Sequence, residues 1–107
     1  MATMQELQRE AARRQSLFRT VNDRIRELVS SDAPDFLCEC VKLECLQLMQ
    51  VPIAEYERIR LTPTRFLVKP GHVLPEAERV TESTDSYIVV EKVGAAAPVA
   101  IELASHG

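Results

Sequence analysis

The sequence predicts an α+β fold: a long N-terminal helix, then a small, mainly antiparallel sheet of hairpins with one short intervening helix. Apolar residues recur every three or four positions over residues 3–29, which is the period of a helix. From residue 36 onwards, short apolar runs alternate with turn residues, which is typical of paired strands. A chain of 107 residues is long enough for one domain with a modest core.

The same patterns divide the chain into three parts. Residues 1–34 form the N-terminal helix and linker, residues 35–94 an α+β core with a thiol cluster, and residues 95–107 a weakly structured tail. The tail is rich in alanine and interrupted by Pro98. It is therefore either a docked helix fragment or a loose end.

The N-terminal helix begins with a capping box, in which Thr3 and Glu6 satisfy each other's free backbone amides. A heptad-like stripe, interrupted by one arginine, then consists of Leu7, Ala11, Arg14, Phe18, Val21, Ile25 and Leu28. A helix of this length spans about 40 Å, more than a small core easily covers. Two arrangements follow. The helix docks on its own domain from Leu17 to Val29 with residues 1–14 solvated, or the stripe is a dimer seam.

All three cysteines lie within eight residues. We expect strands over Phe36–Val41 and Cys45–Val51, joined by a four-residue hairpin loop. In that register Cys40 faces Cys45 across the pair, and Cys38 lies one pleat away on the same face. Three sulfur atoms would therefore converge from local structure alone.

A structural zinc site is closed by four Cys or His ligands, so three thiols need one more. His72 is the best candidate, because Lys69-Pro70-Gly71-His72 is a turn that the glycine can aim. The other candidate, His106, is one residue from the chain end. The sequence thus predicts a zinc site with the ligands Cys38, Cys40, Cys45 and His72. The alternatives are three buried free cysteines that pack as small hydrophobes, or one disulfide and an odd thiol.

The remaining elements follow from local patterns. A short helix is expected over Ile53–Leu61, with Pro52 near its first position. This helix is expected to bury Ile53, Tyr56 and Ile59, with Arg60 as an alternative to Ile59, and otherwise to expose Glu55, Glu57, Arg58 and Arg60. Two further strands are expected over Arg65–Lys69 and Ser86–Val93. Ala77–Glu82 is either a short helix or a strand, and a strand is preferred because Ser83-Thr84-Asp85 then makes a turn into the last strand.

Composition and charge argue against several classes of protein. The net charge of −3 does not suit broad nucleic-acid binding, which needs a positive surface. No apolar run approaches 18 residues, and Met1–Glu6 lacks the apolar region of a signal peptide, so we expect a cytoplasmic protein and no membrane contact. There is no Gly-rich phosphate loop and no recognisable catalytic set. Glu39 and Glu76, the nearest candidates for a catalytic base, are expected to be surface carboxylates.

Several phrases occur together over residues 15–95: Leu17-Phe18-Arg19-x-Val21-Asn22-x-Arg24-Ile25, Phe36-Leu37-Cys38-Glu39-Cys40, Cys45, Glu55-Tyr56-Glu57, Pro63-x-Arg65-Phe66, Pro70-Gly71-His72, Glu78-Arg79-Val80 and Tyr87-x-Val89-Val90-Glu91-Lys92. This combination resembles a family of small bacterial proteins without an assigned activity, most familiar from actinobacteria-like genomes. The resemblance implies that the Cys-x-Cys pair, the third cysteine and the Pro-Gly-His turn belong to one pattern. The chain departs from that family between its second and third cysteines, where relatives tend to carry turn-forming Gly or Asp.

These observations predict a small zinc-stabilised binding or regulatory protein. The alternative is a thiol redox or metal-sensing protein that uses the same cysteines. An enzyme is the third choice, because a catalytic zinc would need an open position and a nearby base. The expected partner is an unidentified protein or a second copy, bound through the N-terminal helix.

Overall fold

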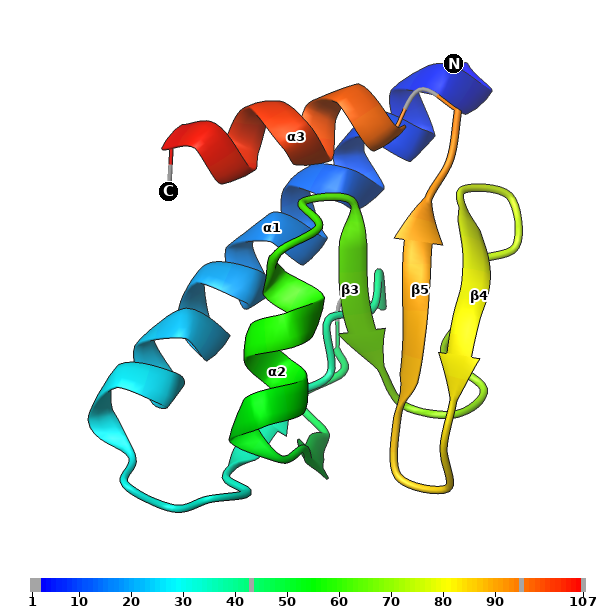
Figure 1. Cartoon of the computed structure of the whole chain (residues 1–107). Helices are drawn as coiled ribbons and strands as arrows, with labels where there is room; N and C mark the ends of the chain where they lie inside the picture. Colours follow the sequence, from blue (N-terminus) through cyan, green and yellow to red (C-terminus); the bar gives the residue numbers. More distant parts are fainter. Residues whose placement is uncertain (1–2, 43, 95, 107) are drawn as a thin grey trace.

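The fold is α+β, as the sequence predicts (Figure 1). The computed structural model describes the backbone of residues 3–42, 44–94 and 96–106. Six side chains within the helix ends lie outside this description: Met4, Gln5, Leu7, Gln8, Ser105 and His106. In chain order the elements are α1 (Met4–Leu28), β1 (Asp35–Leu37), β2 (Leu48–Gln50), α2 (Ile53–Arg60), β3 (Arg65–Val68), β4 (Glu78–Ser83), β5 (Ile88–Lys92) and α3 (Ala96–His106).

Helix α1 begins at the predicted capping box. Thr3 Oγ1 accepts a hydrogen bond from the Glu6 amide at 3.1 Å, and Glu6 Oε2 accepts one from the Thr3 amide at 3.3 Å. The helix ends at Leu28, one residue before the expected end. Local capping chemistry therefore suffices to place the start of this helix.

The buried face of α1 includes only part of the predicted apolar stripe, because Ala11 is buried and Ile25 packs against the core. Its buried side chains are small or polar: Ala11, Ala12, Gln15, Ser16, Arg19 and Asn22. By contrast, Leu28 of the stripe is 76% exposed, so the stripe is wrong at this residue. Leu17, where docking was predicted to begin, is 63% exposed, so that starting point is also wrong. The reason is that α1 lies against backbone segments. Asn22, for example, donates to Leu37 O at 2.8 Å and accepts from the Leu37 amide at 2.8 Å.

The chain end, predicted as a weakly structured tail that is either a docked helix fragment or a loose end, forms helix α3. Figure 1 shows α3 lying across the N-terminal half of α1. Fully buried alanines fill the contact, with Ala12 of α1 against Ala96 and Ala77. Small side chains allow this close approach of backbones. The expectation that residues 1–14 are solvated is therefore wrong at Ala12.

The strands form two antiparallel sheets, one of β1 and β2 and one in the order β3-β5-β4. The three strands of the second sheet lie close to their predicted positions. In the first sheet Phe36 pairs with Met49, but regular pairing ends at Leu37 and Leu48. Both thiol strands are therefore shorter than predicted. Beyond Leu37 the chain forms hydrogen bonds to the other arm of the hairpin and to β3. The Cys38 amide donates to Gln47 O at 2.9 Å, and the Glu39 amide donates to Leu67 O of β3 at 2.7 Å.

The core joins α2 to both sheets. Phe36 of β1 stacks on Tyr56 of α2, with ring centroids 4.2 Å apart and planes 3° apart. Aliphatic residues such as Ile59 and Val89 complete this cluster, and both are fully buried. A second buried cluster contains the cysteines together with Phe66, Val68, Val90 and Ala100. The thiols are thus part of the domain core.

Candidate metal centre

Strand pairing brings the cysteines together. The register that pairs Phe36 with Met49 continues through the hydrogen bond from the Cys38 amide to Gln47 O, and so points Cys40 toward Cys45, as predicted. The Cys45 amide donates to Lys42 O at 3.1 Å and closes the turn between the two cysteines. The hairpin and the turn that closes it therefore bring Cys40 and Cys45 to neighbouring positions.

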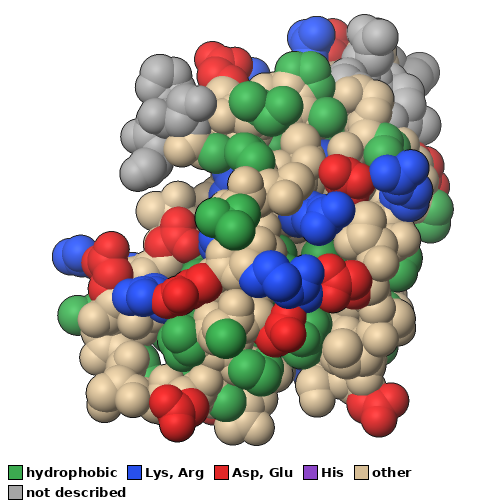
Figure 2. All heavy atoms as spheres, in the orientation of Figure 1, with side chains coloured by type: hydrophobic (Ala, Val, Ile, Leu, Met, Phe, Trp, Pro, Cys, Tyr) green, Lys and Arg blue, Asp and Glu red, His purple; other side chains and the backbone are tan. Residues whose placement is uncertain are grey.

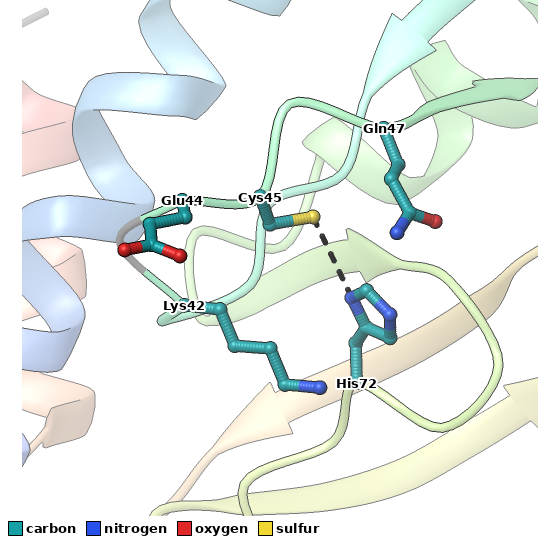
Figure 3. A pocket seen from close by; sticks show the side chains of 5 residues that line it. All are labelled: Lys42, Glu44, Cys45, Gln47 and His72. Atoms are coloured by element: carbon teal, nitrogen blue, oxygen red, sulfur yellow. Dashed lines mark hydrogen bonds between the residues drawn. The ribbon is translucent and has the colours of Figure 1, made fainter.

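The fourth residue arrives from the loop after β3. The His72 amide donates to Lys69 O at 3.0 Å, and Gly71 has φ of +86°. Pro70 followed by a glycine at positive φ is the signature of a type II turn, a conformation that other residues adopt only with strain. The turn directs His72 toward the thiols, where Nδ1 lies 3.5 Å from Cys38 Sγ and 3.6 Å from Cys45 Sγ. Figure 3 shows the Cys45 sulfur and the imidazole pointing at one another.

The four predicted ligands form one cluster. Their sulfur and nitrogen atoms all lie within 4.8 Å of one another, which is close enough to hold a metal ion. The three cysteines are free and buried, and the histidine is partly exposed. The other candidate ligand, the side chain of His106, lies outside the described residues.

Comparison with protein-family models, curated proteins and solved structures finds no match. The resemblance to a small bacterial family therefore stays a prediction, and the chemistry of the cluster must be argued from its own atoms.

The thiols of Cys38 and Cys40 are buried and favour their protonated form, and a bound cation would displace those protons. Burial raises the pKa of Cys38, against the opposing effect of a hydrogen bond from the Lys69 amide, whose nitrogen lies 3.2 Å from its sulfur. Burial likewise raises the pKa of Cys40, against a hydrogen bond from the Lys42 amide. Burial lowers the pKa of His72, and the charges of Lys42 and Lys69 lower it further. A neutral imidazole and thiols that ionise only beside a cation are the groups that metal ions bind.

Glu39, between the first two cysteines, is completely buried, so the prediction of a surface carboxylate is wrong. Its carboxylate accepts hydrogen bonds from Asn22 Nδ2 at 2.7 Å, from the Leu67 amide at 2.8 Å and from the guanidinium of Arg60. Burial raises the pKa of Glu39, while these three donors favour its charged form. Its carbonyl oxygen also accepts from Gln15 Nε2 at 2.8 Å. The Cys-x-Cys segment is therefore held in place from the side opposite the metal ligands. Glu76 is exposed, as expected.

The sequence left Arg60 on the exposed side of α2 or, as an alternative to Ile59, on its buried edge; in the structure Ile59 is buried and only 14% of the Arg60 side chain is exposed. It pairs with Glu39 and lies over the Tyr56 ring, 4.7 Å from the centroid. Burial alone would lower the pKa of Arg60, but Glu39 and Tyr56 outweigh this effect and the pKa is raised. Sequence reasoning missed Asn22 and Arg60 as supports of the site. The signal available in the sequence was a glutamate flanked by two cysteines that were expected to be buried, an unusual position for a surface carboxylate.

An open cavity of about 430 Å³ adjoins the cluster on one side, lined by Lys42, Glu44, Cys45, Gln47 and His72. In Figure 3 Lys42 and Gln47 extend alongside the imidazole. Cys38 and Cys40 do not line this cavity and are fully buried, whereas Cys45 is 7% exposed. The cluster therefore meets solvent at Cys45 and His72.

Proposed function

We propose that this protein is a small zinc-stabilised binding or regulatory module. Cys38, Cys40, Cys45 and His72 would hold the zinc. The observation that carries the proposal is the position of His72 Nδ1, which is nearly equidistant from the sulfur atoms of Cys38 and Cys45. A hydrogen bond from one N–H group would favour one of the two sulfur atoms. Nearly equal distances are expected when the nitrogen and both sulfurs surround one central ion.

Two distances within the cluster agree with tetrahedral zinc. With Zn–S bonds of about 2.3 Å and a Zn–N bond of about 2.1 Å, tetrahedral angles place sulfur and nitrogen about 3.6 Å apart. The two measured separations are 3.5 and 3.6 Å. Three thiolates and Zn²⁺ carry a net charge of −1, and Lys42 and Lys69 lie close enough to His72 to offset it. Because four protein ligands fill the shell, the site suits a structural role and leaves no open position for catalysis.

Metal binding would stabilise the domain where its regular structure is sparse. The strands of the thiol hairpin are only three residues long each, and the ligands come from that hairpin and from the loop after β3. Zinc would join these two loops, and its binding free energy would add to the free energy of folding. Free thiols persist in a reducing compartment, and we accordingly propose a cytoplasmic location.

The test is metal analysis of protein purified without a histidine tag. We expect about one zinc per chain, and a lower melting temperature after chelation. The variant His72→Gln should lose metal and melt at the temperature of the chelated parent. The matched control His106→Gln should keep both zinc and stability. Metal-free protein whose melting temperature does not respond to added zinc would refute the proposal.

The partner surface that we propose is the outward face of α1. Leu17, Val21 and Leu28 lie on one side of the helix, opposite its buried face, and are 63%, 38% and 76% exposed. Large apolar side chains aligned along an exposed helix are typical of helix–helix contacts. Figure 2 shows basic and acidic side chains interspersed on the face in view, a surface that suits a protein partner better than nucleic acid. None of the described helices combines the length and apolar character that a bilayer-spanning helix requires.

We propose a second copy of the chain as the first partner to test. Light scattering after gel filtration should then give a mass that rises with concentration toward a dimer. The double variant with Leu17→Glu and Leu28→Glu should stay monomeric. The control Leu61→Glu changes a residue that is 83% exposed on another element and should leave the dimer intact. A parent that remains monomeric at all concentrations would exclude self-association.

A further inference from the structure

The cavity beside the metal centre reaches only one of its three sulfur atoms. Cys45 lines it, while Cys38 and Cys40 are fully buried. Cys38 is further enclosed by the Lys69 amide and His72. A small polar oxidant that enters the cavity therefore meets the sulfur of Cys45 first.

Both other thiols are within reach of Cys45, because the ligand atoms of the four residues all lie within 4.8 Å of one another. Cys40 is the better placed of the two. Counting on from the pair of Leu37 and Leu48 brings Cys40 opposite Cys45, across the turn that the Cys45 amide closes on Lys42 O. The sulfur of Cys38 is instead in contact with the Lys69 amide and with His72 Nδ1. A disulfide between Cys40 and Cys45 would therefore form within one turn of the chain.

From this geometry, we propose that Cys45 is an oxidation site for hydroperoxides, with Cys40 as the thiol that completes a disulfide. This inference rests on the proposed zinc site. The Cys45 thiolate attacks one peroxide oxygen, the O–O bond breaks, and Cys45 sulfenic acid and hydroxide form. The Cys40 thiolate then attacks the sulfenic sulfur and forms the S–S bond, and a second hydroxide leaves. The two sulfurs together lose two electrons and the peroxide gains them.

Oxidation would end metal binding. The disulfide consumes two of the four ligands, and the remaining Cys38 and His72 form an incomplete shell. The hairpin loop would keep a covalent link but lose its connection to the loop after β3. Peroxide would therefore convert a zinc-stabilised domain into a metal-free one, and a dithiol reductant would reverse the change.

The experiment uses the full-length protein after its zinc content has been measured. Hydrogen peroxide is added with a chromogenic chelator, and released zinc is followed while peptide mass spectrometry locates the disulfide. We expect one Cys40–Cys45 disulfide for each zinc released, and recovery of zinc binding after dithiothreitol. Under limiting iodoacetamide, Cys45 should be alkylated before Cys38 and Cys40.

A variant of the cavity wall separates access from ligand loss. Gln47→Trp places a bulky ring at the cavity beside Cys45 and leaves all four ligands intact, so zinc content should be unchanged and release several-fold slower. The control Gln50→Trp changes an exposed residue of the same hairpin that does not line the cavity, and should react like the parent. Zinc that is bound but resists peroxide, or a first modification at Cys38, would overturn this inference and leave the zinc site standing. Protein that never binds zinc would overturn the proposed function itself.

Discussion

The substitution Glu39→Gln tests how the candidate metal centre is supported. Glu39 is fully buried and accepts hydrogen bonds from Asn22, Leu67 and Arg60. Glutamine keeps the shape of the side chain but loses its charge. Its NH₂ group, which is a hydrogen-bond donor, would face other donors in place of an acceptor. Arg60, only 14% exposed, is left without its buried counter-charge. Removing one member of a buried ion pair costs about 3–5 kcal/mol, a large part of a typical stability of about 5–15 kcal/mol.

The assay is thermal and urea unfolding of zinc-loaded protein, with zinc content measured alongside. A domain of this size shifts by about 4 °C per kcal/mol, so we expect the melting temperature to fall by about 12–20 °C. The control Glu102→Gln alters an exposed carboxylate on α3 and should change stability by no more than about 0.5 kcal/mol. A loss below about 1 kcal/mol for Glu39→Gln would refute the reasoning and indicate that burial keeps this carboxyl neutral.

Three further predictions concern the rest of the domain. Phe36→Ala removes the ring stacked on Tyr56 and should destabilise the protein by about 3–5 kcal/mol in urea unfolding; a loss under about 1 kcal/mol would show that this stack is not part of the core. Gly71→Ala keeps open space around the new methyl but strains φ of +86°, so a loss of about 1–2 kcal/mol is expected, and none at all would argue against the type II turn. A hydrogen bond from Arg58 lowers the pKa of Glu82, so the stability from this pair is present above the ordinary carboxyl pKa and is lost as pH falls through the lowered pKa. The melting-temperature difference between parent and Arg58→Gln should accordingly exist at pH 7 and shrink in acid; a difference independent of pH would contradict the assignment.

The four candidate ligands could be found from sequence because each depends on nearby residues. The hairpin brings Cys40 and Cys45 to neighbouring positions beside one turn, and Pro70 followed by Gly71 forms the turn that aims His72. Neither feature needs knowledge of a distant segment. The zinc itself stays a prediction, since the cluster shows only that a metal ion can be held.

The supports of the site could not be found in this way. Glu39 is bonded by Asn22, Leu67 and Arg60, which lie 17, 28 and 21 residues away in the chain. A buried carboxylate is stable only when such hydrogen-bond partners surround it. The spacing of apolar residues in the sequence does not show which distant residues will do so. The same limit explains the misplaced face of α1, whose inward side chains bond to backbone oxygens in other elements.

By itself, then, the sequence determined the α+β class, the start of α1, the short helix α2, the strands of the second sheet and the group of candidate ligands. Each follows from capping, turn chemistry or apolar spacing within a few residues. Only the tertiary structure decided which side of α1 is buried, that α3 packs across it, and that Glu39 and Arg60 pair inside the domain. The physical reason is that burial of a polar group depends on donors and acceptors brought together by the whole chain, whereas local structure depends on neighbours in sequence.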